Sequence, residues 1–179
     1  MRKSLEETWR YLESLHSDVP RHPDGSPAIL DRMPSIYDEE PRLSFFRTGL
    51  ENADRSYLTM PRTFFGRSLF ERVSFAGTDL SESCLCWNDF NDCDFSGADL
   101  SGCDLRASLF ERCSFAGAVL RGADLRRSHF DDCDFVGADL SGAVAAHTDP
   151  WVRLRERLSP EQVAAMSWVE VAGPEPAGG

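Results

Sequence analysis

Hydrophobic residues recur at every fifth position over the central part of this chain. Phe or Leu occupies all 16 such positions from Phe65 to Leu140. From Phe70 the order Phe-Phe-Leu-Leu repeats, so the full period is four such intervals. An α-helix would place apolar residues about 3.6 apart, and a strand would alternate them with a period of 2. A spacing of five instead indicates a chain that turns a corner at every fifth position.

The positions between these large residues are also regular. Two residues before each one lies a small or modest side chain, such as Ser68, Cys93 or Ala98. Because residues two apart in an extended segment point the same way, each five-residue side sends one large and one small side chain inward. The residue just before the large one points outward and is often Asp. Glycine recurs at the corners, as at Gly97 and Gly117, where a tight turn needs a permissive backbone.

Four sides of five residues close a square coil, and stacked coils place each residue about 4.8 Å above the residue 20 positions earlier. The large side chains then form vertical columns, two of Phe and two mainly of Leu. A longer period of 40 appears where RSLFERVSFAGT (67–78) recurs as ASLFERCSFAGA (107–118). It predicts an outer column of Arg72, Asp92, Arg112 and Asp132, an alternating ladder of ion pairs worth about 0.2–1 kcal/mol per exposed pair.

The repeats SGADL, SGCDL, RGADL and VGADL resemble those of the pentapeptide-repeat family, and the resemblance covers about 85 residues, 61–145. The family resemblance implies an all-β solenoid, a right-handed quadrilateral β-helix, here with about four regular coils. We expect short α-helical additions at the N- and C-terminal ends, because such a solenoid exposes strand edges and apolar core at each end.

This pattern divides the chain into three parts. Residues 1–42 are expected to hold a helix, which begins at the capping box of Ser4 and Glu7, followed by a Pro-rich segment. The β-helix is expected over 43–145, regular from residue 61. Arg55 breaks the five-residue phase, so 56–58 are expected out of register in a degraded first coil. Residues 146–179 are expected to form a helical cap, beginning near Asp149 and again at Ser159, and a flexible tail.

The net charge of −11 argues against direct binding of nucleic acid, because phosphate contacts need Lys and Arg. No apolar run is long enough to cross a bilayer as a helix, so no membrane span is predicted. The N-terminal residues have acids within their apolar stretch and no signal-peptide core, and we therefore expect a cytoplasmic protein. All six Cys lie between Cys84 and Cys133, and in that compartment a disulfide framework is not expected.

The sequence offers little catalytic chemistry. Cys93, Cys113 and Cys133 form one inward column and are interpreted as small buried residues. Cys84 and Cys86 are expected to face outward or toward a corner, and the sequence shows no four converging ligands for zinc. It contains no G-x-S-x-G motif, no P-loop and no paired-carboxylate arrangement. We therefore predict no metal, no cofactor and no enzymatic activity.

Two functions remain open. The first is a protein-binding scaffold with an unknown bacterial partner. The second follows from the family resemblance: some members mimic duplex DNA, bind DNA gyrase or topoisomerase IV and protect it from quinolones or a self-made poison. Duplex DNA has one negative charge per roughly 1.7 Å, or about 12 over four coils. Residues 61–145 carry 14 acidic and 8 basic groups, about half of that net charge.

The candidate contact residues are of two kinds. An acidic surface would be formed by Asp94, Asp99, Asp104, Asp134 and Asp139. Partner or dimer contacts would come from Trp87, Trp151 and Trp168, with a homodimer through the C-terminal segment as one arrangement. Trp87 is expected at an outer corner, where the N-terminal segment covers it or a contact patch includes it, and we favour covering. The residues Arg106, Arg121, Arg126 and Arg127 are expected at successive corners, giving faces of mixed charge.

Overall fold

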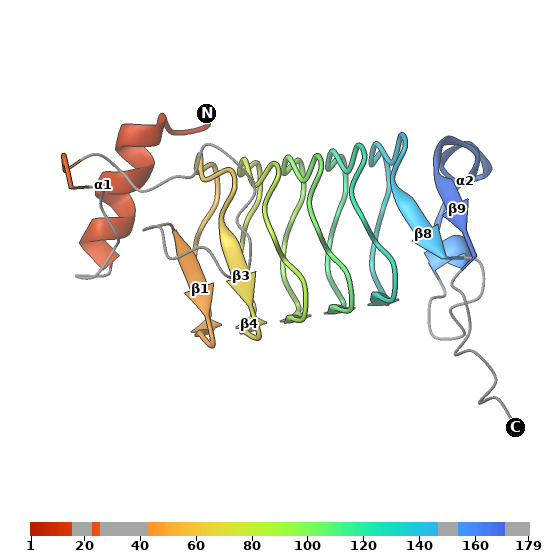
Figure 1. Ribbon diagram of the computed structural model, residues 1–179, viewed down its shortest axis with the longest axis horizontal. Coiled ribbons are helices and arrows are strands. Elements are labelled where there is room, and N and C mark those ends of the chain that lie inside the picture. The colour runs from red at the N-terminus through yellow and green to blue at the C-terminus, as the bar shows by residue number, and fades with distance from the viewer. Residues whose placement is uncertain (16–22, 26–42, 147–153, 171–179) are drawn as a thin grey trace, which may run out of the picture.

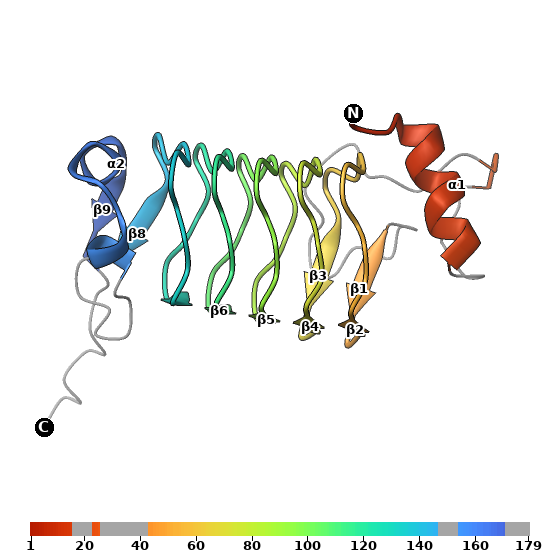
Figure 2. The same ribbon diagram turned by 180° about the vertical axis from the view of Figure 1, so that it is seen from behind.

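The chain forms a β-solenoid of about six turns with short helices at both ends. The computed structural model describes residues 1–15, 23–25, 43–146 and 154–170. Figure 1 shows the coils stacked in a row, with α1 at the N-terminal end and α2 with β9 at the C-terminal end. Figure 2 shows the same order from behind, so the terminal elements lie beyond the ends of the row.

The elements are short. The helices are α1 (Leu5–Leu15), the 3-10 helix η1 (Leu154–Arg157) and α2 (Pro160–Ala165). The strands, each of three residues, are β1 (Ser44–Phe46), β2 (Gly49–Glu51), β3 (Phe64–Gly66), β4 (Leu69–Glu71), β5 (Asp89–Asn91), β6 (Leu109–Glu111), β7 (His129–Asp131), β8 (Val144–Ala146) and β9 (Ser167–Val169).

Parallel pairing between equivalent positions of successive coils holds the solenoid together. The strands β2-β4-β5-β6-β7 form one five-stranded sheet, in which Phe70 pairs with Phe90 and Phe90 with Phe110. On the other walls the pairing continues as single bridges, such as Asp94 to Ser114. The predicted stacking of each residue on the one 20 positions earlier is confirmed.

Phenylalanine rings stack face to face along the core. Phe90, Phe110 and Phe130 are 0–3% exposed, and successive ring centroids lie 4.9 Å apart with the planes within 3° of parallel. The second Phe column, which includes Phe115, meets the first edge-on: the Phe110 and Phe115 rings are inclined at 71°. The two aromatic columns therefore fill one corner of the square interior with both offset-stacked and edge-to-face contacts.

Only two of the four corners use glycine as the sequence predicted. Gly97 and Gly117 have φ of 63° and 65°, the left-handed region that glycine enters without steric cost. At the other two corners the same region is occupied by larger residues, including Arg72 at 54° and Trp87 at 60°. A left-handed conformation costs an L-residue roughly 1–2 kcal/mol, so the repeated hydrogen bonding of the coil imposes it there.

The prediction that Arg55 breaks the phase is wrong. Arg55 occupies the inward position of its side and is 4% exposed, and Met60 at the next inward position is fully buried. Asp54 bridges to Ser74 and Thr59 to Asp79, in the same register as the later coils. The regular coil therefore begins at residue 43, which extends the expected four coils to about six turns.

Helix α1 explains how a cation can occupy a core position in the first coil. Trp9 and Leu12 on this helix are 4% and 1% exposed, and Leu12 belongs to the solenoid's core cluster. The Tyr11 hydroxyl donates to the Asp54 carbonyl oxygen at 2.8 Å. Arg55 donates to the same carbonyl at 2.9 Å, so the guanidinium of this core residue finds an acceptor at the junction between helix and coil.

The C-terminal elements close the other end. β9 pairs in parallel with β8, and this pairing places Trp168 beside Ala145. Helix α2 begins at the predicted Ser159 capping box, and the Gln162 side chain donates to the carbonyls of Phe135 and Ala138 at 2.8 and 3.0 Å. The helix start expected near Asp149 lies outside the described residues, and the homodimer stays a prediction.

No helix among the described residues is long and apolar enough to cross a membrane.

Replacing Phe110 by Ala is expected to lower the free energy of unfolding by about 3–5 kcal/mol, because it leaves a cavity between two stacked rings. Chemical denaturation of the full chain measures this change. Leu69→Ala is the control, since Leu69 lies on the outer surface of the same five-stranded sheet and is 46% exposed. This change should alter the free energy of unfolding by about 0.5 kcal/mol or less. Equal effects of the two changes would contradict the stacked-core description.

Candidate functional site

The outer surface divides into walls that carry different side chains. We call one of them the Trp87 wall. It contains residues 44–46, 64–66, 84–86, 104–106 and 124–126, with the corner residues 67, 87, 107 and 127. The Asp94 wall contains 54–56, 74–76, 94–96, 114–116 and 134–136. The Asp99 wall contains 59–61, 79–81, 99–101, 119–121 and 139–141. The fourth wall is the five-stranded sheet β2-β4-β5-β6-β7.

The five candidate aspartates share one structural role. Each accepts a backbone N–H from the residue two positions later, and so fixes the turn at the corner. These bonds join Asp94 to Ser96 at 2.9 Å, Asp99 to Ser101 at 3.0 Å, Asp104 to Arg106 at 3.0 Å, Asp134 to Val136 at 2.9 Å and Asp139 to Ser141 at 3.0 Å. The recurrence of Asp at this position therefore has a local structural cause.

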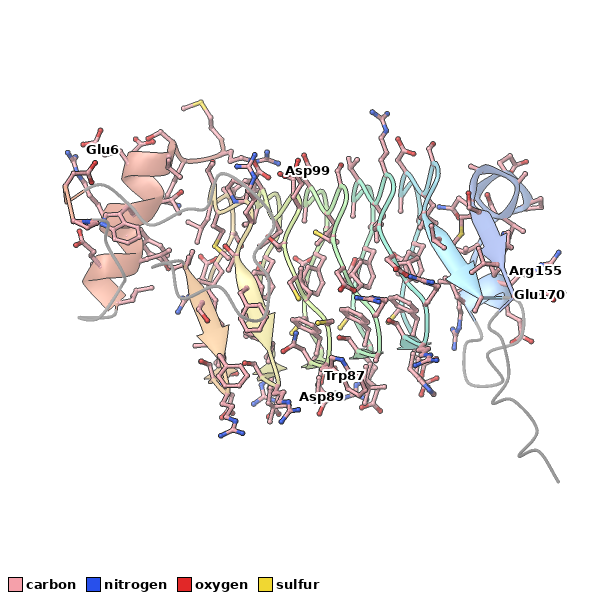
Figure 3. All side chains as sticks on the ribbon, viewed as in Figure 1. Glu6, Trp87, Asp89, Asp99, Arg155 and Glu170 are labelled. Atoms are coloured by element: carbon pink, nitrogen blue, oxygen red, sulfur yellow. The ribbon has the colours of Figure 1, made fainter. Side chains whose placement is uncertain are left out.

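The five aspartates do not form one surface. Asp94 and Asp134 lie on the Asp94 wall, Asp99 and Asp139 on the adjacent Asp99 wall, and Asp104 on the Trp87 wall. Figure 3 shows Asp99 on the opposite side of the solenoid from Trp87 and Asp89. On the Asp94 wall every outward-facing charged residue is an Asp. The aspartates of the Asp94 and Asp99 walls therefore lie on either side of the corner that contains Gly97, whereas Asp104 lies on a different wall.

The arginines are less evenly spread than the sequence predicted. Arg106 and Arg126 occupy the same column of the Trp87 wall and Arg127 its corner, whereas Arg121 lies on the Asp99 wall. Arg106 donates to both oxygens of Asp104 at 2.9 and 2.8 Å. The expected faces of mixed charge are present, since Arg106 and Arg126 pair with aspartates of the Trp87 wall and Arg121 with Asp139 of the Asp99 wall. The four arginines do not occupy four successive corners, however, because the 20-residue period places residues 106 and 126 one above the other.

The predicted ion-pair ladder is only partly present. Arg112 donates to both oxygens of Asp92, at 2.7 and 2.9 Å, across adjacent coils. Arg72 instead pairs with Glu51 and Glu71, and Asp132 pairs with Arg157 at 2.8 Å. The arginines of this column therefore pair with acidic residues of the preceding coil or of their own coil, and not with one fixed position.

Trp87 projects from the Trp87 wall. It is 66% exposed to solvent, so the favoured interpretation that the N-terminal segment covers it is wrong for the described residues. Trp168, in contrast, is partly buried against the core and donates its Nε1–H to the Val163 carbonyl at 3.0 Å. Trp151 lies outside the described residues. Of the three candidate tryptophans, Trp87 alone is shown as an exposed surface residue.

Two cavities flank Trp87. One, of about 640 Å³, has an aromatic lining that includes Phe46 and Phe64, together with Arg67. The other, of about 480 Å³, is lined by three arginines, Arg106, Arg126 and Arg127, and reaches Val169 and Glu170 near the C-terminal cap. The exposed indole therefore separates an apolar hollow from a basic one.

Cys84 and Cys86 lie on the same wall, with their sulfur atoms 3.1 Å apart. Both residues flank the inward Leu85 on the outer side of the coil, as expected, but Cys84 is buried there and Cys86 is half-buried. Their mutual hydrogen bond lowers the pKa of the Cys84 thiol and raises that of the Cys86 thiol. Sulfur atoms of this pair and a carboxylate oxygen of Asp104 all lie within 4.8 Å of one another.

Sequence reasoning missed this group because it searched for ligands close together in the chain. Asp104 occupies the position equivalent to Cys84 one coil later, and the two residues bridge directly. The repeat itself contained the necessary signal, since equivalent positions of adjacent coils stack at about 4.8 Å.

Comparison with known proteins identifies the repeat. The family model described as pentapeptide repeats matches residues 68–106 and 108–144, in eight copies. The chain belongs to the pentapeptide-repeat family. A search of curated proteins found no match.

One solved pentapeptide-repeat protein shares the fold, and two further solved proteins are similar at lower TM-scores. HetL from the cyanobacterium Nostoc sp. strain PCC 7120 is 18% identical with a TM-score of 0.56, over 60% of this chain and 50% of HetL. The chain thus spans about half the length of that protein. A pentapeptide-repeat protein from the Arabidopsis thaliana thylakoid lumen is 27% identical over 65% of this chain and 72% of its own, with a TM-score of 0.36. Full-length QnrB1, a plasmid-mediated fluoroquinolone resistance protein, is 19% identical over 57% and 74% of the two chains, with a TM-score of 0.30.

Asp139 is expected to make stability depend on pH in the acid range. Hydrogen bonds from Ser141 and Arg121 lower the pKa of Asp139 to about 2, against about 3.9 in an unfolded chain. Its contribution to stability is therefore complete above about pH 4 and is lost as the pH falls toward 2. A carboxyl NMR titration should place its midpoint near 2, and Asp139→Asn should flatten the acid side of the stability profile. A midpoint near 3.9 would contradict these hydrogen bonds.

Proposed function

We propose that this protein is a non-enzymatic scaffold that binds an acidic protein segment with an exposed apolar side chain, and that the segment docks on the Trp87 wall. The observation that carries this proposal is Trp87 itself, a 66% exposed indole held in a left-handed backbone conformation between an apolar and a basic hollow.

The position of Trp87 has a cost that stability does not explain. A bulky residue at φ 60° is an unfavourable choice where Asn or Gly would fit the same turn. A large exposed apolar side chain adds little to folding, because its burial is incomplete. Strained, exposed aromatic residues of this kind are typical of contact sites, where tryptophan supplies much of the binding energy.

The two hollows define the chemistry of the partner. The aromatic hollow beside Phe46 and Phe64 would take an apolar side chain. The basic hollow, with Arg127 at its corner, would take carboxylates, which arginine binds in a bidentate geometry. From the coil of Phe46 to that of Arg126 is four coil steps, about 19 Å, which about six residues of extended peptide would span.

The wall suits binding along its length rather than catalysis. Its charged groups are largely engaged with one another, as in the pairs of Arg106 with Asp104 and Arg126 with Asp124. Such pairs can exchange for a partner's carboxylates without leaving a buried charge, because they lie at the surface. A repetitive, rigid surface of this kind requires little rearrangement on binding, which favours affinity.

Peptide selection on the immobilised full chain tests the proposal. Enriched peptides should combine Asp or Glu with a large apolar residue, and Trp87→Asn should weaken their binding at least tenfold. Asn tolerates the left-handed backbone, so the variant should remain folded.

Tyr57→Asn is the matched control, because Tyr57 is also an exposed aromatic residue, 49% exposed, with φ 57° at another corner. Its binding should equal that of the unmodified protein. Equal losses in the two variants, or selection of peptides without acidic residues, would refute docking on the Trp87 wall.

A second candidate function is protection of DNA gyrase or topoisomerase IV by mimicry of DNA. One specific observation favours it, the concentration of aspartates on the adjacent Asp94 and Asp99 walls. Six aspartates lie there over five coils, namely Asp54, Asp79, Asp94, Asp99, Asp134 and Asp139. Arg121 on the Asp99 wall pairs with Asp139 and offsets one of these charges. At about 4.8 Å per coil this leaves one net negative charge per roughly 5 Å, against the 3.4 Å spacing of phosphates on one DNA strand.

A gyrase supercoiling and cleavage assay with a quinolone separates the two functions. Under the mimicry hypothesis the protein protects or inhibits gyrase, and the combined change Asp94→Asn, Asp99→Asn and Asp134→Asn abolishes the effect. The amide oxygen keeps the turn hydrogen bond, so the fold should survive. Under the same hypothesis Trp87→Asn has no effect. Absence of any effect of the unmodified protein on gyrase would exclude this second function.

A further inference from the structure

Cys84 and Cys86 differ in position from the other four cysteines of the chain. The others occupy the small inward position, where their thiols donate to a backbone carbonyl, as Cys103 does to Leu80 at 3.0 Å and Cys113 to Phe90 at 3.4 Å. Those residues are explained as small members of the core. Cys84 and Cys86 instead flank the inward residue Leu85 on the outer side of the coil, so core packing does not explain them.

The register brings a third ligand-bearing side chain to the pair. Asp104, in the next coil, forms a β-bridge with Cys84. A carboxylate oxygen of Asp104 and the two sulfur atoms lie within 4.8 Å of one another. Zinc bound tetrahedrally at about 2.3 Å from sulfur places two thiolates roughly 3.8 Å apart. The sulfur atoms are now 3.1 Å apart, so small side-chain rotations would open the pair to accept a cation.

We propose that Cys84, Cys86 and Asp104 form a binding site for a thiophilic divalent cation of the zinc type, with solvent as the fourth ligand. Two thiolates and one carboxylate select such a cation over magnesium or calcium, which prefer ligand sets made of oxygen alone. The site joins two coils of the solenoid, because the cysteines come from one and the aspartate from the next.

Arg106 supports the site from outside the ligand set. Its side chain donates to both oxygens of Asp104 at 2.9 and 2.8 Å, and its backbone N–H donates to one of them at 3.0 Å. Hydrogen-bonded carboxylates of this kind keep a fixed orientation toward a metal. Its positive charge, with that of a divalent cation, balances the three negative charges of two thiolates and one carboxylate.

Solvent can reach the site. Cys86 lines both cavities beside Trp87, and Cys84 is 8% exposed behind it. The cation can therefore enter through either hollow, and a water molecule can complete its coordination there. Because the site lies on the same wall as Trp87, a bound cation would also reinforce the backbone that carries the proposed docking surface.

Titration of the reduced full chain with Co²⁺ tests this site, because cobalt replaces zinc and reports thiolate ligation by its charge-transfer absorption. The unmodified protein should bind one Co²⁺ per chain with that absorption and should release it to Zn²⁺. Cys84→Ser and Cys86→Ser should each weaken binding at least 100-fold, and Asp104→Asn at least tenfold. Zinc should raise the midpoint of thermal unfolding, because it binds only the folded chain at this site.

Two variants provide matched controls. Cys103→Ser removes one thiol from the core at a position where the equivalent residue of the preceding coil is already a serine, Ser83. Asp124→Asn removes the next aspartate of the Asp104 column, which makes the same turn hydrogen bond, to Arg126 at 3.1 Å. Both should bind Co²⁺ as the unmodified protein does.

Three results would overturn the proposal. The first is binding without thiolate charge transfer, or no binding, in the reduced unmodified protein. The second is equal affinity in Cys86→Ser and Cys103→Ser, and the third is equal affinity in Asp104→Asn and Asp124→Asn. Cys86 is half-buried at the surface, so Cys86→Ser should fold, and the unfolding midpoint of each variant without metal verifies this.

Discussion

Parallel hydrogen bonding between equivalent positions of adjacent coils controls every other feature of this molecule. Adjacent coils exchange backbone hydrogen bonds in both directions, as when Phe75 donates to the Asp94 carbonyl at 2.7 Å and Asp94 donates back to the Val73 carbonyl at 3.0 Å. Because this register is constant, each side chain stands directly above its counterpart in the preceding coil. The stacked Phe columns follow from it, and so do the columns of aspartates and arginines outside.

The same register turns the outer surface into a grid in which function depends on departures from the repeat. Aspartate before each inward residue fixes the corner, as Asp94 and Asp134 do through the N–H two positions later. A wall that keeps the repeat therefore becomes acidic for structural reasons alone. The Trp87 wall departs from the repeat at Cys84, Cys86 and Trp87, and its chemistry differs accordingly. These departures carry both the proposed docking surface and the proposed metal site, whereas the acidic walls would carry mimicry of DNA.

The two ends of the solenoid are covered by elements that lie outside the repeat. A coil in the middle is covered above and below by copies of itself, whereas a terminal coil must be covered by something that the repeat does not encode. At the N-terminal end α1 supplies Leu12 to the core and Tyr11 to the first coil, and at the C-terminal end β9 continues the pairing beyond β8. The polar ends of Arg55 and Gln162 are accommodated at these junctions, because helix and coil there share hydrogen bonds.

The five-residue spacing by itself determined the solenoid, its columns and its buried residues, because no other regular backbone places a large apolar side chain inward at that interval. Phe110 and Leu120 could be assigned to the core without any coordinates. Arg55 could not, because its burial depends on α1, which is distant in sequence and outside the repeat. The exposure of Trp87 and the grouping of Cys84, Cys86 and Asp104 were likewise decided by the tertiary structure. A repeat specifies which residues stack, but side-chain rotamers and the terminal elements decide which of them stay exposed and which atoms meet.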